Sequence, residues 1–222
     1  MSNDTTQWMP IELTGKTAVV CGASQGIGLA AAQHLAGLGA RVILMARNKG
    51  KLEIALATLS EPSRHDYSVA DFSDSSLVKT AIQAIVEREP VHILVNNTGG
   101  PAGGPITEAK PDAFIRTFEQ HLICNQILAQ AVLPSMKTAG YGRIINVIST
   151  SVKQPLAGLG VSNTVRGAVA SWAKTWANEV GTSGITVNNI LHGATNTSRL
   201  DEIVHSKAEK TGQSAADIRS QM

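Results

Sequence analysis

Three glycines near the N-terminus have the spacing of a nucleotide-binding turn. Gly22, Gly26 and Gly28 follow an apolar run and open a helical pattern, so they would lie between a strand and a helix. Glycine keeps such a turn tight, and the free N–H groups and positive dipole of a helix N-terminus attract a pyrophosphate. We therefore interpret this turn as a dinucleotide site. The expected contact residues are Gly22, Ser24, Gln25, Gly26, Ile27 and Gly28.

The residue after the second apolar run indicates which dinucleotide would bind. Sites for NAD usually place a carboxylate there, about 20 residues after the glycines, to bind the ribose 2′-hydroxyl. This sequence has Arg47 at that place. A guanidinium binds a phosphate through paired hydrogen bonds, so we expect NADP(H) in preference to NAD(H). The alternative is that Arg47 is an ordinary solvated cation.

These residues need a scaffold, and the alternation of short apolar runs with longer helical patterns predicts one. Several of the runs are apolar almost throughout, as strands buried on both faces should be. Such alternation is typical of right-handed βαβ units, so we predict an α/β fold with a Rossmann-type, doubly wound parallel sheet and helices on both faces. The predicted strands are 16–21, 41–46, 65–70, 91–95, 143–148 and 185–190, and the predicted helices are about 27–38, 49–59, 74–88, 111–138 and 162–182.

We expect a single domain over 1–222, with its core at about 13–200 and a polar helical tail over 201–222. Small and polar residues follow the predicted strands at one edge of the sheet: Asp71, then Asn96–Gly100 (NNTGG), Ser149 and His192. Ligands of open α/β sheets bind beyond the carboxyl ends of the strands. These residues should therefore line one site together with the glycine turn.

The composition excludes several other classes. The 222 residues are 43% hydrophobic and 16% charged, whereas a disordered chain needs low hydrophobicity and high charge. A formal net charge of +2 gives no reason to expect a nucleic-acid or membrane surface. The start of the chain is polar, without the apolar stretch of a signal peptide, and no cysteine or histidine cluster has metal-ligand spacing. Because Cys21 and Cys124 lie in apolar segments, we expect a cytoplasmic protein with buried, reduced thiols.

Several motifs together resemble the short-chain dehydrogenase/reductase family, over about 13–200. They are Cys21–Gly28 (CGASQGIG), Asp71, Asn96–Gly100 (NNTGG), Leu133–Pro134, Gly142–Ser149 (GRIINVIS) and Glu179–Gly193 (EVGTSGITVNNILHG). The resemblance implies that Asp71 contacts the adenine, that Asn96 lines the adenosine side of the cofactor and that Thr197 meets the nicotinamide amide. The further expected cofactor contacts are Gly99, Arg166, Gly193 and Thr195.

The resemblance also has consequences for assembly. It implies a homo-oligomer, a dimer or a tetramer, formed through the helices at 111–138 and 162–182. Family members usually carry a further helix and a last strand beyond the point where this sequence stops. We therefore expect the sheet to end at six strands, with an exposed edge unless a partner or the tail covers it.

The sequence departs from the family at the catalytic positions. Family members use a Ser and a Tyr-x-x-x-Lys pair: the Tyr exchanges a proton with the substrate oxygen, the Ser hydrogen-bonds that oxygen, and the Lys holds the ribose and lowers the pKa of the Tyr. Ser149 matches the Ser, and the same register places Ser162 at the Tyr position and Arg166 at the Lys position. The two tyrosines, Tyr67 and Tyr141, lie outside this register.

Two histidines stand at further family positions. His121 occupies the place of an Asn that links the family's proton relay to water, and His192 follows the sixth predicted strand. A serine hydroxyl is a far weaker acid than a phenol, whereas imidazole titrates near neutral pH. Our hypothesis is that His192 supplies or relays the proton while Ser149 and Ser162 orient the oxygen. The alternative is that His192 caps a loop and His121 packs in the helix interface.

We predict an NADP(H)-dependent oxidoreductase that interconverts a carbonyl and an alcohol on a small molecule, as ketoacyl reductases do. Ser149 would bind the substrate oxygen, Ser162 would replace the Tyr hydroxyl with or without a water, and Arg166 would hold the ribose. Two alternatives stay open. One is a catalytically degraded protein that binds NADP(H) as a sensor or structural subunit, and the other is a lyase or isomerase on the same scaffold.

Overall fold

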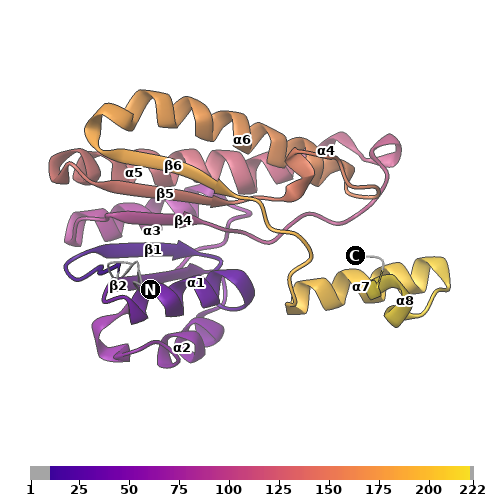
Figure 1. The fold of residues 1–222 in the computed structure, drawn as a ribbon, viewed down its shortest axis with the longest axis horizontal. Helices are drawn as coiled ribbons and strands as arrows, with labels where there is room; N and C mark the ends of the chain where they lie inside the picture. The colour runs from indigo at the N-terminus through magenta and orange to yellow at the C-terminus, as the bar shows by residue number, and fades with distance from the viewer. Residues whose placement is uncertain (1–10, 221–222) are drawn as a thin grey trace, which may run out of the picture.

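A six-stranded parallel sheet forms the centre of the computed structural model (Figure 1), which describes residues 11–220 apart from some side chains after residue 198. The polar start of the chain and the last two residues of the predicted tail lie outside the described residues. The strands lie in the order β3-β2-β1-β4-β5-β6 and every pair is parallel. They are β1 Thr17–Cys21, β2 Arg41–Ala46, β3 Asp66–Val69, β4 Ile93–Asn96, β5 Gly142–Val147 and β6 Ile185–Ile190.

Helices cover both faces of this sheet, which confirms the predicted doubly wound fold. Alternate residues of β1 belong to two separate apolar clusters: Val19 packs with side chains of α3 and α5, and Val20 packs with side chains of α1 and α2. Every residue of β1 is therefore buried, as its unbroken apolar sequence predicts. The helices are α1 Gly26–Gly37, α2 Lys49–Ala57, α3 Ser75–Arg88, α4 Pro111–Phe118, α5 Cys124–Ala139, α6 Gly160–Val180, α7 Ser198–Thr211 and α8 Ala215–Ser220.

The predicted helix over 111–138 is not continuous. A π-helical segment, Glu119–Ile123, separates α4 from α5. The side chain of His121 in this segment is only 3% exposed. Short π-helical turns of this kind occur frequently at functional sites. The prediction of one long helix was wrong at this point, because a periodic apolar pattern does not distinguish an α-helix from one with a single wider turn.

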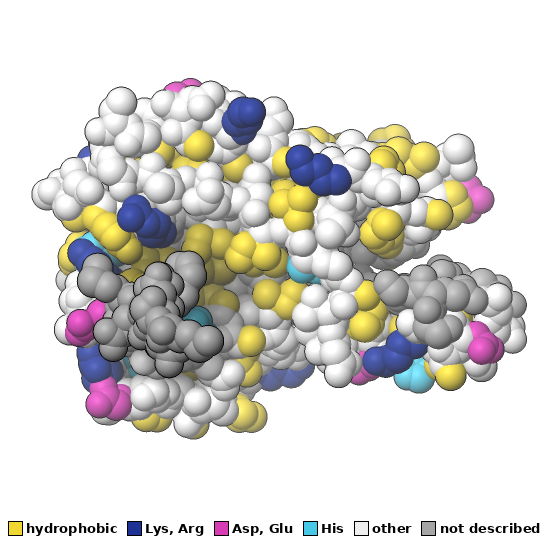
Figure 2. Space-filling model, in the orientation of Figure 1, with side chains coloured by type: hydrophobic (Ala, Val, Ile, Leu, Met, Phe, Trp, Pro, Cys, Tyr) yellow, Lys and Arg dark blue, Asp and Glu magenta, His cyan; other side chains and the backbone are white. Residues whose placement is uncertain are grey.

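The end of the described chain forms a helical pair that stands away from the body. Figure 1 shows α7 and α8 on the side toward which the strands point, and in Figure 2 a notch separates this pair from the rest of the surface. β6 is the last strand on its side of the sheet in the described part of the chain. No helix among the described residues is long and apolar enough to cross a membrane.

Candidate active site

The glycine turn after β1 is held by an asparagine that we did not single out from the sequence. Asn97 Nδ2 donates to the carbonyls of Cys21 and Gly22, at 3.2 and 3.3 Å. A Cβ added to Gly22 would lie 2.6 Å from the carbonyl oxygen of Asn97, and one added to Gly28 would lie 2.4 Å from the carbonyl oxygen of Gly22. Both glycines are thus required by close packing inside the turn. The second Asn of the NNTGG motif was the signal for Asn97.

The N-terminus of α1 can receive an anion. Gln25, the residue before α1, makes no side-chain cap to the helix, and the first turn holds no acidic residue. The N–H groups of this turn and the positive end of the helix dipole therefore lack a competing negative group from their own helix, which fits a pyrophosphate. Gln25 Oε1 accepts a hydrogen bond from Lys51 Nζ at 3.1 Å, and its Nε2 donates to Ser198 Oγ at 3.3 Å.

The chain returns to the same turn after β6. A Cβ on Gly26 would lie 3.4 Å from Cγ2 of Thr197, so these two predicted cofactor residues are neighbours. Thr197 Oγ1 also caps α7 by accepting a hydrogen bond from Leu200 N–H. Gly193 and Thr195 are exposed on the intervening segment. The structure therefore places all of these residues at the carboxyl edge of the sheet, where they were expected.

Arg47 and Asp71 lie together at the ends of the neighbouring strands β2 and β3. Asp71 Oδ1 accepts hydrogen bonds from the backbone N–H and the hydroxyl of Ser73, both at 2.9 Å. These bonds lower the pKa of Asp71, and the positive charge of Arg47 adds to the effect. Arg47 is exposed, and none of the ion pairs found among the described side chains involves it. Its guanidinium is free to meet a phosphate.

Three asparagines form a row across the carboxyl ends of β4, β5 and β6. Asn96 Nδ2 donates to Asn146 Oδ1 at 2.8 Å, and Asn146 Nδ2 donates to Asn189 Oδ1 at 3.0 Å. Asn96 is only 1% exposed. Its Nδ2 is therefore committed to the sheet, whereas its buried Oδ1 has no hydrogen-bond partner among the described residues. The sequence showed no pairing for Asn146 and Asn189, because neighbouring strands are assigned only by tertiary structure.

The three residues at the catalytic family positions come from β5 and α6. Ser149 follows β5, is half-buried, and its Oγ accepts the backbone N–H of Ser151 at 3.1 Å. Arg166 is 8% exposed, and its Nη1 donates to the carbonyl of Val147 at 2.7 Å. Burial lowers the pKa of Arg166 to about 10, so the guanidinium stays charged at neutral pH. Ser162 is half-buried one helical turn earlier on α6.

The two histidines have different surroundings. Burial and the nearby charge of Arg166 lower the pKa of His121 to about 3, so this ring is neutral at physiological pH. His192 is half-buried, and its Nδ1 lies 2.8 Å from the carbonyl oxygen of Gly193. The carbonyl of His192 accepts the N–H of Thr150 at 3.2 Å, which ties the segment after β6 to the residues after Ser149. This backbone hydrogen bond places His192 near Ser149.

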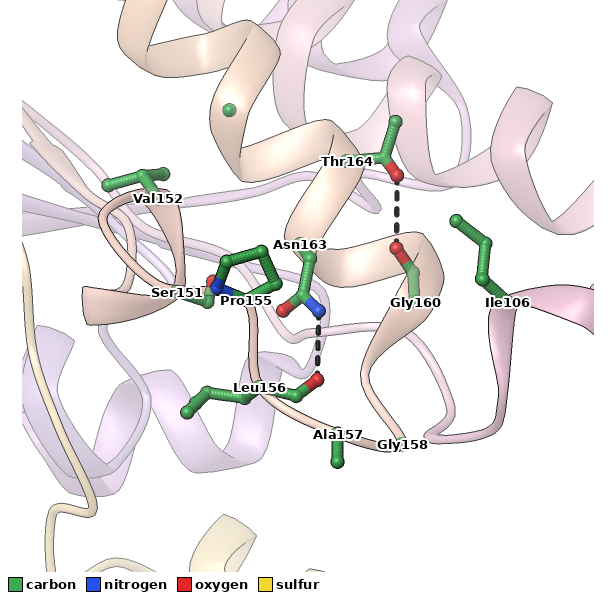
Figure 3. A pocket seen from close by; sticks show the side chains of 11 residues that line it. Ile106, Ser151, Val152, Pro155, Leu156, Ala157, Gly158, Gly160, Asn163 and Thr164 are labelled. Atoms are coloured by element: carbon green, nitrogen blue, oxygen red, sulfur yellow. Dashed lines mark hydrogen bonds between the residues drawn. The ribbon is translucent and has the colours of Figure 1, made fainter.

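A cavity of about 440 Å³ lies between the segment after β5 and the start of α6 (Figure 3), and its lining includes Ser151 and Asn163 but neither Ser149 nor Ser162. Its lining is largely apolar and includes Ile106, Val152 and Leu156. Asn163 Nδ2 donates to the carbonyl of Leu156 at 2.9 Å. The cavity was not predicted, since it depends on how two loops meet. Apolar clefts of this size with a few polar groups are typical of small-molecule sites.

The described residues contain no group of three or more side chains that could hold a metal ion. The arrangement instead combines an anion-binding turn, an exposed arginine, a hydroxyl and a buried cation at one edge of the sheet. Such a set can hold a phosphorylated dinucleotide and orient a small polar group of a second molecule.

Comparison with known proteins supports this description. Residues 16–208 match the family described as short chain dehydrogenase. A 2,3-dihydroxy-2,3-dihydro-p-cumate dehydrogenase of Pseudomonas putida is 33% identical over 190 residues, which cover 84% of this chain and 73% of the relative. The structure of a single-residue variant of actinorhodin polyketide ketoreductase with NADPH is 30% identical, with a TM-score of 0.84 and coverage of 91% of this chain and 79% of that one.

A second solved structure is similarly close. L-Sorbose reductase from Gluconobacter frateurii, complexed with NADPH and L-sorbose, is 30% identical with a TM-score of 0.87, over 94% of this chain and 81% of that one. The family match spans residues 16–208, and the two solved structures cover 91% and 94% of this chain. The chain therefore belongs to the short-chain dehydrogenase family of oxidoreductases.

Proposed function

We propose that this protein is an NADP(H)-dependent oxidoreductase that interconverts a carbonyl and an alcohol on a small molecule. The observation that carries the proposal is that Ser149 and the buried Arg166 lie at the same sheet edge as the uncapped glycine turn. Two similar proteins, the polyketide ketoreductase and L-sorbose reductase, were solved with NADPH. The exposed Arg47 at the end of β2 supports the phosphorylated cofactor over NAD(H).

The residues divide the work of the reaction. Bound NADP(H) supplies or accepts the hydride at the substrate carbon. In the reducing direction the carbonyl oxygen must also gain one proton. Ser149 hydrogen-bonds that oxygen, Ser162 orients it directly or through a water, and Arg166 holds the ribose hydroxyls. His192 supplies or relays the proton, since its backbone carbonyl is hydrogen-bonded to Thr150 N–H next to Ser149.

A second candidate function follows from Ser162 and Arg166. A hydroxyl is a poor proton donor, and an arginine does not exchange protons at neutral pH, so the substitution of the Tyr-x-x-x-Lys pair favours a protein that binds NADP(H) as a sensor or structural subunit.

One experiment separates the two functions. NADPH absorbance is followed with a panel of ketones, diketones and aldehydes, for the wild type and for the Ser162→Tyr/Arg166→Lys double variant. The proposed function requires the wild type to oxidise NADPH with at least one of these compounds. A wild type that binds NADPH and never oxidises it, beside a double variant that does, would establish the sensor.

We also propose that α5 and α6 join copies of this chain into a dimer or tetramer. Trp172 Nε1 and Trp176 Nε1 both donate to Gln126 Oε1, at 2.7 and 3.0 Å, and these three residues line a cavity of about 540 Å³ over the two helices. Half-buried tryptophans on helices of this kind suit a protein interface. Sedimentation over a range of concentrations tests this.

A cytoplasmic location is proposed from the free, buried Cys21 and Cys124.

A further inference from the structure

The buried His121 contacts the loop that follows β4, and the proposed mechanism does not use this contact. His121 lies in the π-helical segment between α4 and α5 and is 3% exposed. Its Nδ1 lies 2.7 Å from Oγ1 of Thr98, and its Nε2 lies 3.4 Å from the same oxygen. Thr98 is two residues beyond the end of β4. His121 therefore connects the segment between α4 and α5 to the carboxyl edge of the sheet.

The hydrogen bonds of the ring can be assigned from its surroundings. Burial and the positive charge of Arg166 hold the pKa of His121 at about 3, so the ring carries a single N–H at neutral pH. We assign the single N–H of the ring to the side of the Gly99 backbone, because the interaction with that backbone favours the protonated form. The other ring nitrogen then accepts the hydroxyl hydrogen of Thr98. Both nitrogens of His121 are thus occupied within the protein.

Further hydrogen bonds hold the two ends of this loop. Asn97 fixes its beginning to the glycine turn through the carbonyls of Cys21 and Gly22. Gly104 fixes its far end, because Gly104 N–H donates to Gly158 at 2.7 Å and Gly104 accepts from Gly160 N–H at 3.3 Å. Between these two points lie Thr98 and the glycine- and proline-rich residues after it.

The contact between His121 and Thr98 matters because of where the loop lies. The segment crosses the sheet edge between the glycine turn and the start of α6, which carries Ser162 and Arg166. Gly99 is also one of the residues expected to contact the cofactor. A loop rich in glycine has little stiffness of its own, so its position depends on such attachments.

We propose that His121 is a positioning residue that holds Thr98 and Gly99 in place at the cofactor edge, and that it does not carry a proton to the substrate. This inference rests on the proposed function for its kinetic readout. The matched pair Thr98→Val and Thr98→Ser tests it, because valine keeps the shape of threonine without the hydroxyl and serine keeps the hydroxyl. We expect Thr98→Val to lower kcat by about 10²-fold, the cost typical of a misplaced catalytic geometry.

The remaining expectations separate positioning from a general loss of structure. Thr98→Ser should keep a kcat within about threefold of the wild type, and both variants should keep the far-UV circular dichroism and the cooperative unfolding of the wild type. Thr98→Val combined with His121→Ala should be no worse than His121→Ala alone, because both remove the same contact. Wild-type kcat in Thr98→Val, or a Thr98→Ser variant as impaired as Thr98→Val, would overturn the inference.

A measurement without catalysis keeps the inference separate from the proposed function. The ring nitrogens of His121 are observed by NMR in the wild type between pH 5 and 8. A positioning residue should stay neutral in one tautomer over this whole range, and a ring that titrates within it would contradict the inference. If the ring stays neutral and no compound of the panel is reduced, the proposed function fails while the role of His121 in holding Thr98 stands.

Discussion

The two halves of the sheet present their functional groups in different ways. In the half built from β1, β2 and β3, the glycine turn and the first turn of α1 offer backbone N–H groups, and the packing of Gly22 and Gly28 fixes their shape. In the half built from β4, β5 and β6, side chains do the work: Ser149, Arg166 and the histidine that holds Thr98. The first half keeps the glycine turn, and the second half carries Ser162 and Arg166, which we interpret as replacements for the Tyr-x-x-x-Lys pair of the family.

The difference follows from what each half must supply. A backbone that cradles a pyrophosphate tolerates little change, because a side chain at Gly22 or Gly28 would collide with the backbone of the chain itself. A proton can come from several kinds of group, provided that one of them reaches the substrate oxygen. Variants in the two halves should therefore fail in different ways: the first through cofactor binding, the second through turnover.

The largest effect is expected from Gly28→Ala in the glycine turn. The new Cβ would lie 2.4 Å from the carbonyl oxygen of Gly22, so the turn must move. We expect NADPH binding to fall below detection in calorimetry and the free energy of unfolding to drop by about 1–3 kcal/mol. The matched control is Gly37→Ala at the end of α1, which has open space around it and should change stability by no more than about 1 kcal/mol. If Gly28→Ala kept the wild-type affinity for NADPH, the glycine turn would not be part of the binding site.

Ser149→Ala is the corresponding variant in the second half. Loss of a hydrogen bond to the reacting oxygen typically costs about 10²–10³-fold in kcat, and we expect that loss with no change in NADPH affinity. Ser149→Thr, which keeps a hydroxyl, should recover part of the rate. The exposed Ser171 of α6 provides the control as Ser171→Ala. If Ser149→Ala lost NADPH affinity and turnover equally, the claim that the second half acts on turnover alone would be wrong.

The first half of the sheet was also the easier one to predict from the sequence. All six strands and the helices α1, α2 and α3 could be placed from the apolar runs, and the glycine turn from its spacing, because both depend on neighbours along the chain. Three features could not be predicted from the sequence. They are the break in the helix at 119–123, the hydrogen-bonded row from Asn96 through Asn146, and the hydrogen bonds by which Asn97 holds the glycine turn. Each of these involves contacts between residues that are distant in sequence, and the sequence does not reveal which polar groups become partners.

His192→Ala tests which group of the second half supplies the proton. If His192 is the donor, its loss should lower kcat by about 10²-fold between pH 6 and 8 and leave NADPH affinity unchanged. The exposed His205 of α7 is the control as His205→Ala. If His192→Ala kept the full rate over that pH range, His192 would not be the donor, and a water held by Ser149 and Ser162 would supply the proton.

The smallest effect is expected from Arg47→Ala, which returns to the first half and asks whether any side chain there carries specificity. Arg47 is exposed and has no acidic partner among the described ion pairs, so its loss should not disturb the fold. A charge-assisted hydrogen bond to the 2′-phosphate is worth about 1.5–3 kcal/mol when buried, and less at an exposed site, so we expect the NADPH affinity to fall by about tenfold. The affinity for NADH should stay the same, because NADH lacks the phosphate. Titration of both cofactors, with Lys174→Ala on the exposed face of α6 as the control, measures the ratio. An unchanged NADPH-to-NADH ratio would show that in this half the backbone alone selects the ligand.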